Sequence, residues 1–370
     1  MHMKKTLTHF IGKHLKVYLA YSRDRSIRFS SASGGVATTL LEYLLEKNYI
    51  DAVVVPRPRF RQGFVYGVWT VVRDPSEILK FSGSLYAPVF GLSKVLAYAL
   101  NRFKRIAVTA IPCHARTVRK ISEFHDRNED VFIIGLYCNN TPSSWATKYA
   151  LKYFGIKVEE AESVKPRGLG WPGYTIIKTK TSTICIPFSL FWGSGFGQYF
   201  YGLGCYLCVD HTNTSADISL ADPWTLPHEH IRRLGGATLV IVRSRQGLEV
   251  FENAVRSGYI SAVEVDPVYA VQYATLLTSS KRGLGRNVGE PVLPPGFTTI
   301  IHELVYNLGQ LLASRESLWP LLRVYHGIVR PLAFKIGSLF DYKLGTTWAK
   351  VSEYIRLMQK VKLPDKGLST

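Results

Sequence analysis

Short apolar runs that alternate with helix-like segments are the feature that most constrains the fold of this chain. The runs Val17–Tyr21, Ile106–Ile111 and Val131–Tyr137 are rich in aliphatic residues, as buried strands are. The amphipathic segment Val36–Lys47 follows the first run, and the basic segment Ala115–Phe124 follows the second. This alternation predicts an α/β core with a mixed, partly parallel sheet.

Further elements are expected around this core. The patterns indicate strands at Asp51–Val55, Gly63–Val72, Ala216–Leu220 and Gly236–Arg243, a strand pair within Tyr174–Pro187, and helices at Gly91–Phe103, Pro142–Phe154 and Gln246–Ser257. Ser22–Arg28 is typical of a charged turn. Near Pro294-Pro295-Gly296 the chain becomes helical, aromatic and basic. We therefore expect a core domain of residues 15–290 and a helical extension of residues 291–370.

The chain is strongly basic, with 370 residues, a formal net charge of +19 and a pI near 9.7. Such a field attracts anionic cofactors, acidic proteins, anionic membranes or nucleic acid. The charges are dispersed and no nucleic-acid-binding motif accompanies them, so a nucleic-acid partner is not expected. No stretch approaches the ~18 apolar residues of a membrane span, and the N-terminus lacks a signal-peptide pattern. We therefore expect a cytoplasmic protein, either free or in peripheral contact with the membrane.

Four of the five cysteines stand in turn-like settings. They are Cys113, Cys138, Cys205 and Cys208, and only Cys185 is left over. A Cys-x-x-Cys pair and two single thiols can hold one cubane cluster. On spacing alone, buried core cysteines and a zinc site remain open as alternatives.

Three loops have compositions that suit an anionic ligand. The turn Ser33-Gly34-Gly35 precedes a helix, where free amide groups could bind phosphate; an ordinary helix cap is the alternative. Ser82–Pro88 is a second loop of small residues, which could approach a ligand or be a simple turn. Lys165–Gly173 combines two cations with a tryptophan, a composition that suits a planar, anionic ligand. An aromatic surface loop without a ligand is the alternative. Asp217 and Asp222 flank a short strand, where capping and turn roles are common.

Taken in order, these motifs resemble the beta subunit family of coenzyme F420-reducing hydrogenases and F420-linked dehydrogenases. The resemblance covers roughly residues 17–258. The matching segments are Ser33-Gly34-Gly35, Ser82-Gly83-Ser84-Leu85-Tyr86, Pro112-Cys113-His114, Cys138-Asn139-Asn140-Thr141-Pro142, Arg167–Gly173, Cys205–Asp210 and Ala216–Trp224.

The resemblance implies FAD, one [4Fe-4S] cluster and coenzyme F420 as a cosubstrate. The cluster ligands it implies are Cys113, Cys138, Cys205 and Cys208. The expected flavin or substrate contacts are Ser33, Gly34, Gly35, Thr38, Ser82, Ser84, Tyr86, Asn139, Thr141, Lys165, Arg167, Trp171, Asp217 and Asp222. In such a site the protein binds and orients the cofactors, which carry the redox chemistry.

The function that follows from the resemblance is a flavin and iron–sulfur oxidoreductase. It would transfer electrons or hydride between coenzyme F420, or a ferredoxin-type donor, and an organic acceptor. The alternatives are a subunit that relays electrons to a partner enzyme, a membrane-surface reductase of a lipid or isoprenoid-type substrate, and a redox-inactive scaffold or assembly factor. A redox protein and a second copy of the chain are the candidate partners.

The C-terminal extension carries apolar residues at helical spacing. These are Leu321, Tyr325, Val329, Leu332 and Ile336, beside several cations. The spacing predicts a helix that covers the core, with an amphipathic membrane anchor as the alternative.

Overall fold

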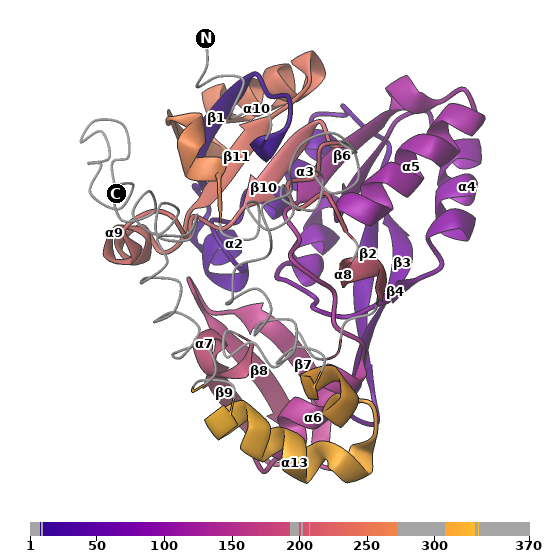
Figure 1. Cartoon of the computed structure of the whole chain (residues 1–370). Coiled ribbons are helices and arrows are strands. Elements are labelled where there is room, and N and C mark those ends of the chain that lie inside the picture. Colours follow the sequence, from indigo (N-terminus) through magenta and orange to yellow (C-terminus); the bar gives the residue numbers. More distant parts are fainter. Residues whose placement is uncertain are drawn as a thin grey trace, which may run out of the picture.

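The computed structural model describes residues 8, 10–192, 200, 203–206, 208–272, 308–329 and 332. In this part of the chain a nine-stranded sheet has the order β12-β1-β11-β10-β6-β5-β2-β3-β4, and a three-stranded sheet has the order β7-β8-β9 (Figure 1). The prediction of an α/β fold with a mixed sheet is confirmed.

The strands have the following bounds. They are β1 (Lys16–Ser22), β2 (Ala52–Arg61), β3 (Phe64–Val72), β4 (Val89–Phe90), β5 (Ile106–Ala110), β6 (Val131–Leu136), β7 (Ala161–Gly168), β8 (Tyr174–Thr179), β9 (Thr183–Pro187), β10 (Ile218–Ala221), β11 (Thr238–Val242) and β12 (Ile260–Glu264).

The main helices alternate with these strands. They are α2 (Arg25–Ser30), α3 (Val36–Glu46), α4 (Leu92–Arg102), α5 (Pro112–Phe124), α6 (Trp145–Tyr153), α7 (Phe188–Phe191), α8 (Leu203–Tyr206), α9 (His228–Arg233), α10 (Arg245–Arg256) and α13 (Trp319–Val324). Among the short 3-10 helices, η1 (Pro75–Phe81) precedes β4 and η5 (Glu316–Leu318) precedes α13. No helix in the described residues is long and apolar enough to span a bilayer.

The parallel part of the large sheet is the run β10-β6-β5-β2. In its registers Ile106 pairs with Val131, and Ile218 pairs with Ile134. Strands β1, β11 and β12 continue the sheet in antiparallel pairing. Because parallel strands end at one common edge, the loops after β5 and β6 come together.

Helices cover both faces of the large sheet, and the alternation of side chains along β2 shows how. Val53 and Val55 pack on the side of α3 and α10. Ala52 and Val54 pack on the side of α4 and α5. A strand buried on both faces needs a continuous apolar run, which is the signal that located it in the sequence.

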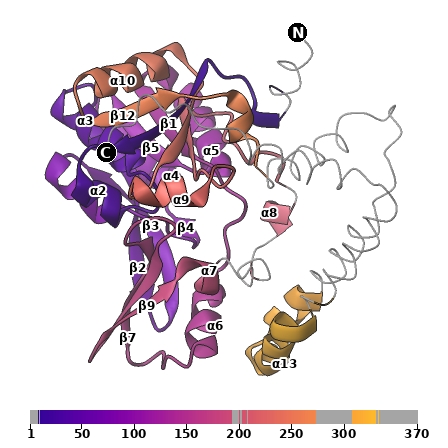
Figure 2. The same cartoon turned by 90° about the vertical axis from the view of Figure 1, so that its left-hand side faces the viewer.

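The second sheet forms a smaller lobe with α6, α7 and α13, seen below the large sheet in Figure 2. Trp319 of α13 lies edge-on to Tyr149 of α6, with ring centroids 5.3 Å apart. The described part of the extension therefore packs on the small lobe, although through a different face from the expected one. Trp319, Leu322 and Tyr325 are buried, whereas Leu321, Val329 and Leu332 are exposed. Ile336 lies outside the described residues.

Three local elements differ from the sequence-based expectation. The expected turn Ser22–Arg28 contains the start of α2, because the Asp24 carboxylate accepts hydrogen bonds from the amides of Ser26 and Ile27 and caps the helix. Helix α5 begins at Pro112 instead of Ala115, so Cys113 lies in its first turn. Lys165–Gly168 is the end of a strand, β7. The boundary expected near residue 290 lies outside the described residues and stays a prediction.

Candidate cofactor-binding site

Two of the four cysteines lie at the edge where the parallel strands end. Cys113 follows β5 and Cys138 follows β6, and these strands are hydrogen-bonded neighbours. Loops after adjacent parallel strands form the usual binding edge of an α/β sheet. The fold itself therefore places two thiols, 25 residues apart in the sequence, at one place.

The Cys-x-x-Cys pair is held against the Cys138 loop. The Thr141 amide donates to Sγ of Cys205 at 3.4 Å, and Oγ1 of Thr141 lies 4.0 Å from Sγ of Cys138. The amide of Cys208 donates to the carbonyl of Cys205 at 3.2 Å, which closes a turn between the pair. Thr141 is thus the link between the two cysteine segments.

The four thiols are close enough to influence one another's ionisation. Burial raises the pKa of Cys138, and Cys113, Cys205 and Cys208 raise it further as like-charged neighbours. Burial also raises the pKa of Cys113, with Cys208 and Cys205 acting in the same direction, although this residue keeps an exposed surface. A raised pKa favours the protonated form of Cys113 and Cys138, and a bound cation would stabilise their thiolates instead.

Four cysteine thiols are the donor set that a [4Fe-4S] cluster takes. Within the described residues, no three His, Cys, Asp or Glu side chains are arranged to hold a metal ion. A cluster supplies its own sulfide and spans a wider space, and it takes four thiolates from separate segments. Cys185, by contrast, lies exposed on β9 and pairs in register with Ile176 in the small sheet.

The Ser33 turn is fixed between two strands, and its serine is not a helix cap. The hydroxyl of Ser33 donates to the carbonyl of Ala237, and the Gly34 amide donates to Oγ1 of Thr238 at 2.9 Å. A Cβ on Gly34 would lie 2.8 Å from the carbonyl oxygen of Ala20, so only glycine fits between β1 and β11. Gly35 takes the left-handed conformation at the start of α3, with φ of 79°.

No side chain caps the start of α3. The first amides of a helix lack partners within the helix and favour an anion. Thr38, in the first turn, is buried. The start of α3 thus has uncapped amides of the kind that can bind a phosphate group, and the phosphate role stays a prediction.

The Ser82 loop meets the end of α2 through Lys165. The ammonium of Lys165 donates to the carbonyl of Ser30 at 2.9 Å and lies 3.5 Å from Oγ of Ser82. Burial lowers the pKa of Lys165. Both of these partners are neutral oxygens, so the structure leaves the charge of this half-buried lysine without a carboxylate among the described residues. Ser84 is half-buried on the same loop.

Arg167, Trp171 and Asp222 form one buried polar unit. Arg167 donates to both carboxylate oxygens of Asp222, at 2.6 and 3.1 Å, and the Trp171 indole donates to the same carboxylate at 3.1 Å. Arg167 is 0% exposed. Its guanidinium lies over Phe188 and Trp224, 4.3 and 5.4 Å from the ring centroids.

The charge of Arg167 is therefore directed at Asp222 inside the protein. Burial acts to lower the pKa of Arg167, but Asp222 and Tyr86 outweigh it, so the pKa is raised and the residue stays charged. Nη1 of Arg167 lies 3.4 Å from the hydroxyl of Tyr86, which ties the unit to the Ser82–Tyr86 loop. The expected contacts from three separate motifs thus meet in one place.

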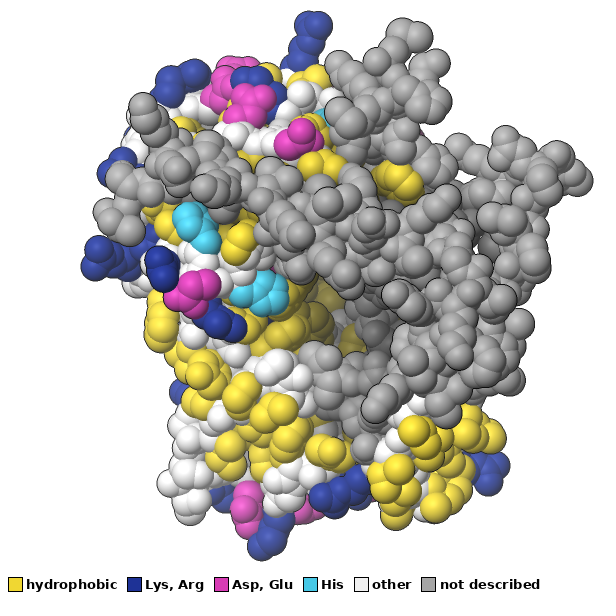
Figure 3. All heavy atoms as spheres, turned by 60° about the vertical axis from the view of Figure 1, so that its left-hand side comes forward, with side chains coloured by type: hydrophobic (Ala, Val, Ile, Leu, Met, Phe, Trp, Pro, Cys, Tyr) yellow, Lys and Arg dark blue, Asp and Glu magenta, His cyan; other side chains and the backbone are white. Residues whose placement is uncertain are grey.

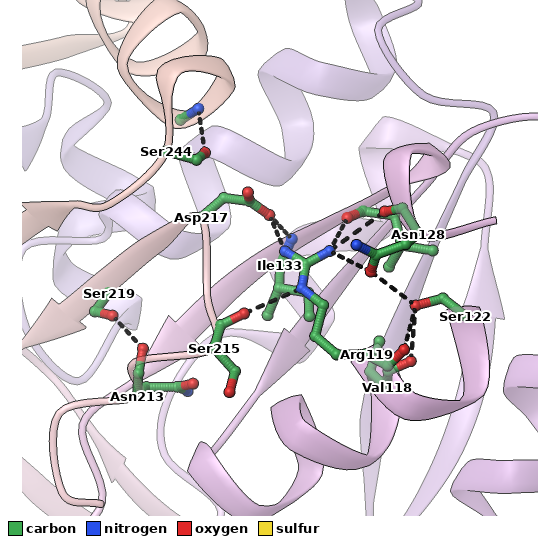
Figure 4. Close-up of polar contacts among 12 residues, drawn as sticks. Val118, Arg119, Ser122, Asn128, Ile133, Asn213, Ser215, Asp217, Ser219 and Ser244 are labelled. Carbon is green, nitrogen blue, oxygen red and sulfur yellow. Dashed lines mark hydrogen bonds and ion pairs between the residues drawn. The ribbon is translucent and has the colours of Figure 1, made fainter. Parts of the chain in front are cut away.

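Asp217 lies at the other end of β10 from Asp222 and belongs to a different network. Its carboxylate accepts from Arg119 at 2.7 Å and from the Ile133 amide at 2.8 Å (Figure 4). Arg119 also donates to the carbonyl of Val131 at 2.9 Å. This network fastens α5, and with it Cys113, to β6 and β10.

Sequence reasoning missed His211, which lies at the site. His211 shares two hydrogen bonds with Cys138: its carbonyl accepts from the Cys138 amide at 3.0 Å, and its Nδ1 lies 2.9 Å from the Cys138 carbonyl. The signal was available, because His211 follows Cys208 by three residues. Asn139 is exposed, beside this network.

The side chains on the surface around the Arg167–Asp222 unit differ in type between the two lobes. Figure 3 shows histidine and mixed charges over α9, and mainly hydrophobic side chains below, over the small lobe and over α13. Residues of α9 join the aromatic cluster of the buried unit, since His228 is edge-on to Trp171 with centroids 5.1 Å apart.

Two sequence profiles of one family match the chain. The N-terminal profile of the coenzyme F420 hydrogenase/dehydrogenase beta subunit matches residues 17–97, and the C-terminal profile of the same family matches residues 103–268. Together they span most of the large sheet and the β7–β9 sheet, and they include all four cysteines of the site.

Named relatives agree with these profiles. The F420-dependent formate dehydrogenase subunit beta of Methanocaldococcus jannaschii is 28% identical over 249 residues, which is 66% of this chain and 61% of the relative. The chain thus matches less than two-thirds of that relative's length. The coenzyme F420 hydrogenase subunit beta of Methanosarcina barkeri is 24% identical over 280 residues, covering 70% of this chain and 85% of the relative.

A solved structure shares the fold. A chain of the F420-reducing NiFe hydrogenase complex from Methanosarcina barkeri, determined in a xenon-derivatisation study, superposes with a TM-score of 0.58 at 20% identity. The match covers 77% of this chain and 98% of that chain.

Proposed function

The chain belongs to the coenzyme F420 hydrogenase/dehydrogenase beta subunit family, and from this premise we propose that it binds FAD and one [4Fe-4S] cluster. In this proposal it transfers electrons or hydride between coenzyme F420, or a ferredoxin-type donor, and an organic acceptor. The observation that carries the proposal is the contact of Thr141, in the Cys138 loop after β6, with Cys205, beside the end of β5 that leads to Cys113. When bound, the flavin exchanges hydride and the cluster exchanges single electrons.

In the proposal Cys113, Cys138, Cys205 and Cys208 hold the cluster. Thr141 supports this role, because it contacts segments of both the single thiol and the pair. His211 orients Cys138 through two hydrogen bonds. Residues that fix a ligand's own geometry in this way commonly tune the cofactor that it holds.

The flavin would lie between the Ser33 turn and the Ser82–Tyr86 loop. The uncapped amides at the start of α3, from Gly35 to Thr38, would bind its phosphates. Ser33 and Gly34 would fix the shape of this turn, because the hydroxyl of Ser33 and the amide of Gly34 donate to Ala237 and Thr238. Lys165 would supply a cation to an anionic group of the flavin or of F420, because it has no carboxylate partner among the described residues. Ser82, Ser84, Asn139 and Thr141 complete the proposed contacts.

Arg167, Trp171, Asp217 and Asp222 act in this proposal as positioning residues. Arg167, Trp171 and Asp222 form one buried unit, and this unit holds Tyr86 and the Gly168–Gly173 loop in place. Asp217 holds the helix that carries Cys113. None of these carboxylates needs to touch the flavin for its loss to disturb the site.

Absorbance of the anaerobically purified protein tests the proposal. We expect flavin maxima together with a broad shoulder that dithionite bleaches. A colourless protein with full zinc occupancy would refute both cofactors. Turnover of F420 by the isolated chain would then show an enzyme. Reduction of F420 only in the presence of a partner protein would show an electron relay. The exposed surface of Cys113 is the observation that supports the relay.

A second proposal concerns membrane contact by the extension. Leu308, Leu311, Leu321, Val324, Ile328 and Leu332 are exposed apolar side chains within residues 308–332. Such a face favours an interface with lipid, and the net positive charge favours anionic lipid. Co-sedimentation with phosphatidylglycerol vesicles tests it, and a protein that stays in the supernatant at low salt would refute it.

A further inference from the structure

The outer layer formed by α4 and α5, as far as residue 122, carries charged side chains of one sign. Residues 92–122 contain seven Lys and Arg residues and no Asp or Glu. The exposed ones are Lys94, Arg102, Lys104, Arg105, Arg116 and Lys120. The remaining cation, Arg119, points inward to Asp217 (Figure 4).

The exposed cations of this layer are not neutralised by neighbouring acids. Among the described residues, none of the six forms an ion pair. The carboxylates that follow in sequence, Glu123, Asp126, Glu129 and Asp130, lie in the last turn of α5 or after it, and Asp130 pairs with Arg127. The N-terminal half of the layer therefore keeps its full positive field.

This basic layer includes the most accessible thiol of the site. Cys113, Arg116 and Lys120 are spaced by three and four residues on α5, so they share one face of the helix, and all three are exposed. Helix α4 packs beside α5 through Leu96, Ala99 and Val118 (Figure 1). Both helices border β5 in the sequence, one leading into it and one leading away. Their N-terminal turns therefore lie at the same end, which places Lys94 at the end where Cys113 lies.

We propose that this α4–α5 face, defined by Lys94, Arg116 and Lys120 around Cys113, docks an acidic electron-transfer protein. The inference rests on the proposed function, because it takes Cys113 as a ligand of the cluster. One electron passes between the partner's redox centre and the cluster at Cys113, with no bond formed or broken and no proton moved. Charge complementarity of this kind mainly speeds association and is sensitive to salt.

An acidic protein fits this face better than a nucleic acid or a membrane does. Tyr98 of α4, four residues from both Lys94 and Arg102, is 57% exposed, and aromatic residues and arginine are enriched in protein interfaces. The exposed thiol of Cys113 lies where a redox protein could exchange electrons with the site, which a nucleic acid or a lipid cannot do. Binding to nucleic acid and binding to anionic membrane are therefore treated as outcomes of the test.

Binding of an acidic clostridial-type ferredoxin, measured by calorimetry at 20 and 300 mM NaCl, tests the proposal. The variant is Arg116→Glu with Lys120→Glu, and the matched control is Lys178→Glu with Lys180→Glu, which makes the same charge change on exposed residues of the small lobe. At low salt we expect about ten-fold weaker binding or more for the helix variant and less than two-fold for the control. Salt should remove most of the difference.

Several results would overturn the proposal. One such result is that the wild-type chain does not bind ferredoxin. A second is that both variants bind ferredoxin equally weakly. A third is that duplex DNA or anionic vesicles bind the wild-type chain more tightly than ferredoxin does, and that the helix variant loses this binding. Melting temperatures equal to that of the wild type establish that the variants fold. If the Arg116→Glu, Lys120→Glu variant does not fold, Arg116→Gln with Lys120→Gln replaces it. Because binding is measured as heat, it does not depend on iron content. Salt-sensitive binding by an iron-free chain would support the face while refuting the cluster, and an iron-loaded chain that does not bind would refute the face alone.

Discussion

The backbone amide of Thr141 donates a hydrogen bond to Sγ of Cys205, 64 residues further along the chain, at 3.4 Å. Through this contact the loop after β6 meets the short helix α8. The Cys138 loop and the segment of Cys205 and Cys208 therefore lie together, next to the end of β5, the strand that precedes Cys113. Asp222 follows β10, which runs parallel to β6, so it lies at the same edge of the sheet. The relationship gives the cluster proposal its physical basis.

Asp222→Asn should be the most destabilising conservative change in the buried unit. It removes the negative charge that faces a guanidinium with no exposed surface. Breaking a buried ion pair by removing one partner costs about 3–5 kcal/mol. Urea unfolding measures this loss, and Glu229→Gln, in a pair with Arg233 that is largely exposed, serves as the control with a change below about 0.5 kcal/mol. Equal losses in the two variants would show that burial of the pair is unimportant.

Asp217→Asn should loosen α5 without touching any cysteine. The change removes a charge-assisted hydrogen bond from Arg119 and weakens the bond from the Ile133 amide. Bonds to charged groups contribute about 1.5–3 kcal/mol each, so we expect a loss of that order. Faster hydrogen exchange in residues 112–124 and a lower iron content per chain are the readouts, and unchanged exchange in α5 would refute this role.

Gly34→Ala should disturb the start of α3 more than a glycine change elsewhere does. A Cβ at this position would come within 2.8 Å of backbone atoms of both Ala20 and Ala237, so β1 or β11 must move. Gly91→Ala is the control, because its added Cβ meets nothing within 4 Å and only its φ of 88° is unfavourable, at about 1–2 kcal/mol. We expect loss of bound flavin and a greater loss of stability at Gly34. Retention of flavin in Gly34→Ala would place the phosphates elsewhere.

Much of the large sheet could be predicted because its strands are buried on both faces. β5 and β6 appear as aliphatic runs, and the structure begins both at the expected residues. Helix α2 was missed because its charged residues obscured the capping signal of Asp24. Strand β12 was not predicted, since Ile260–Glu264 carries few buried side chains.

The candidate site was predicted as a set of residues but not as an arrangement. Local patterns identify Cys205 and Cys208 as a pair, yet nothing local shows that Thr141 contacts Cys205. Likewise, Asp217 and Asp222 look equivalent in the sequence, and only the direction of β10 separates them. Such relations depend on strand order, which is set by the whole fold.

Acid should weaken the contact between the C-terminal segment and α6. Lys152 and Lys148 donate to Glu316 and hold the pKa of its carboxyl below the ordinary value of 4.5. Because the folded-state pKa is lowered, this contribution is fully present above pH 4.5 and is lost as the pH falls through the folded-state value. The pair is partly exposed, so the effect is below about 1 kcal/mol.

Hydrogen exchange of residues 308–329 as a function of pH measures this contact. Protection should fall with acid in the wild type, and Glu316→Gln should show reduced protection at neutral pH without the same acid step. An identical pH profile in the variant would assign the step to another group.

The most direct test of the central claim is the iron content of two single-cysteine variants purified anaerobically. Cys205 lies at the thiol site, whereas Cys185 is exposed on the small sheet. We expect Cys205→Ser to lose the iron and the dithionite-sensitive absorbance, and Cys185→Ser to keep about four iron atoms per chain, as one cubane requires. Equal iron in the two variants would contradict the assignment of the cluster to this site.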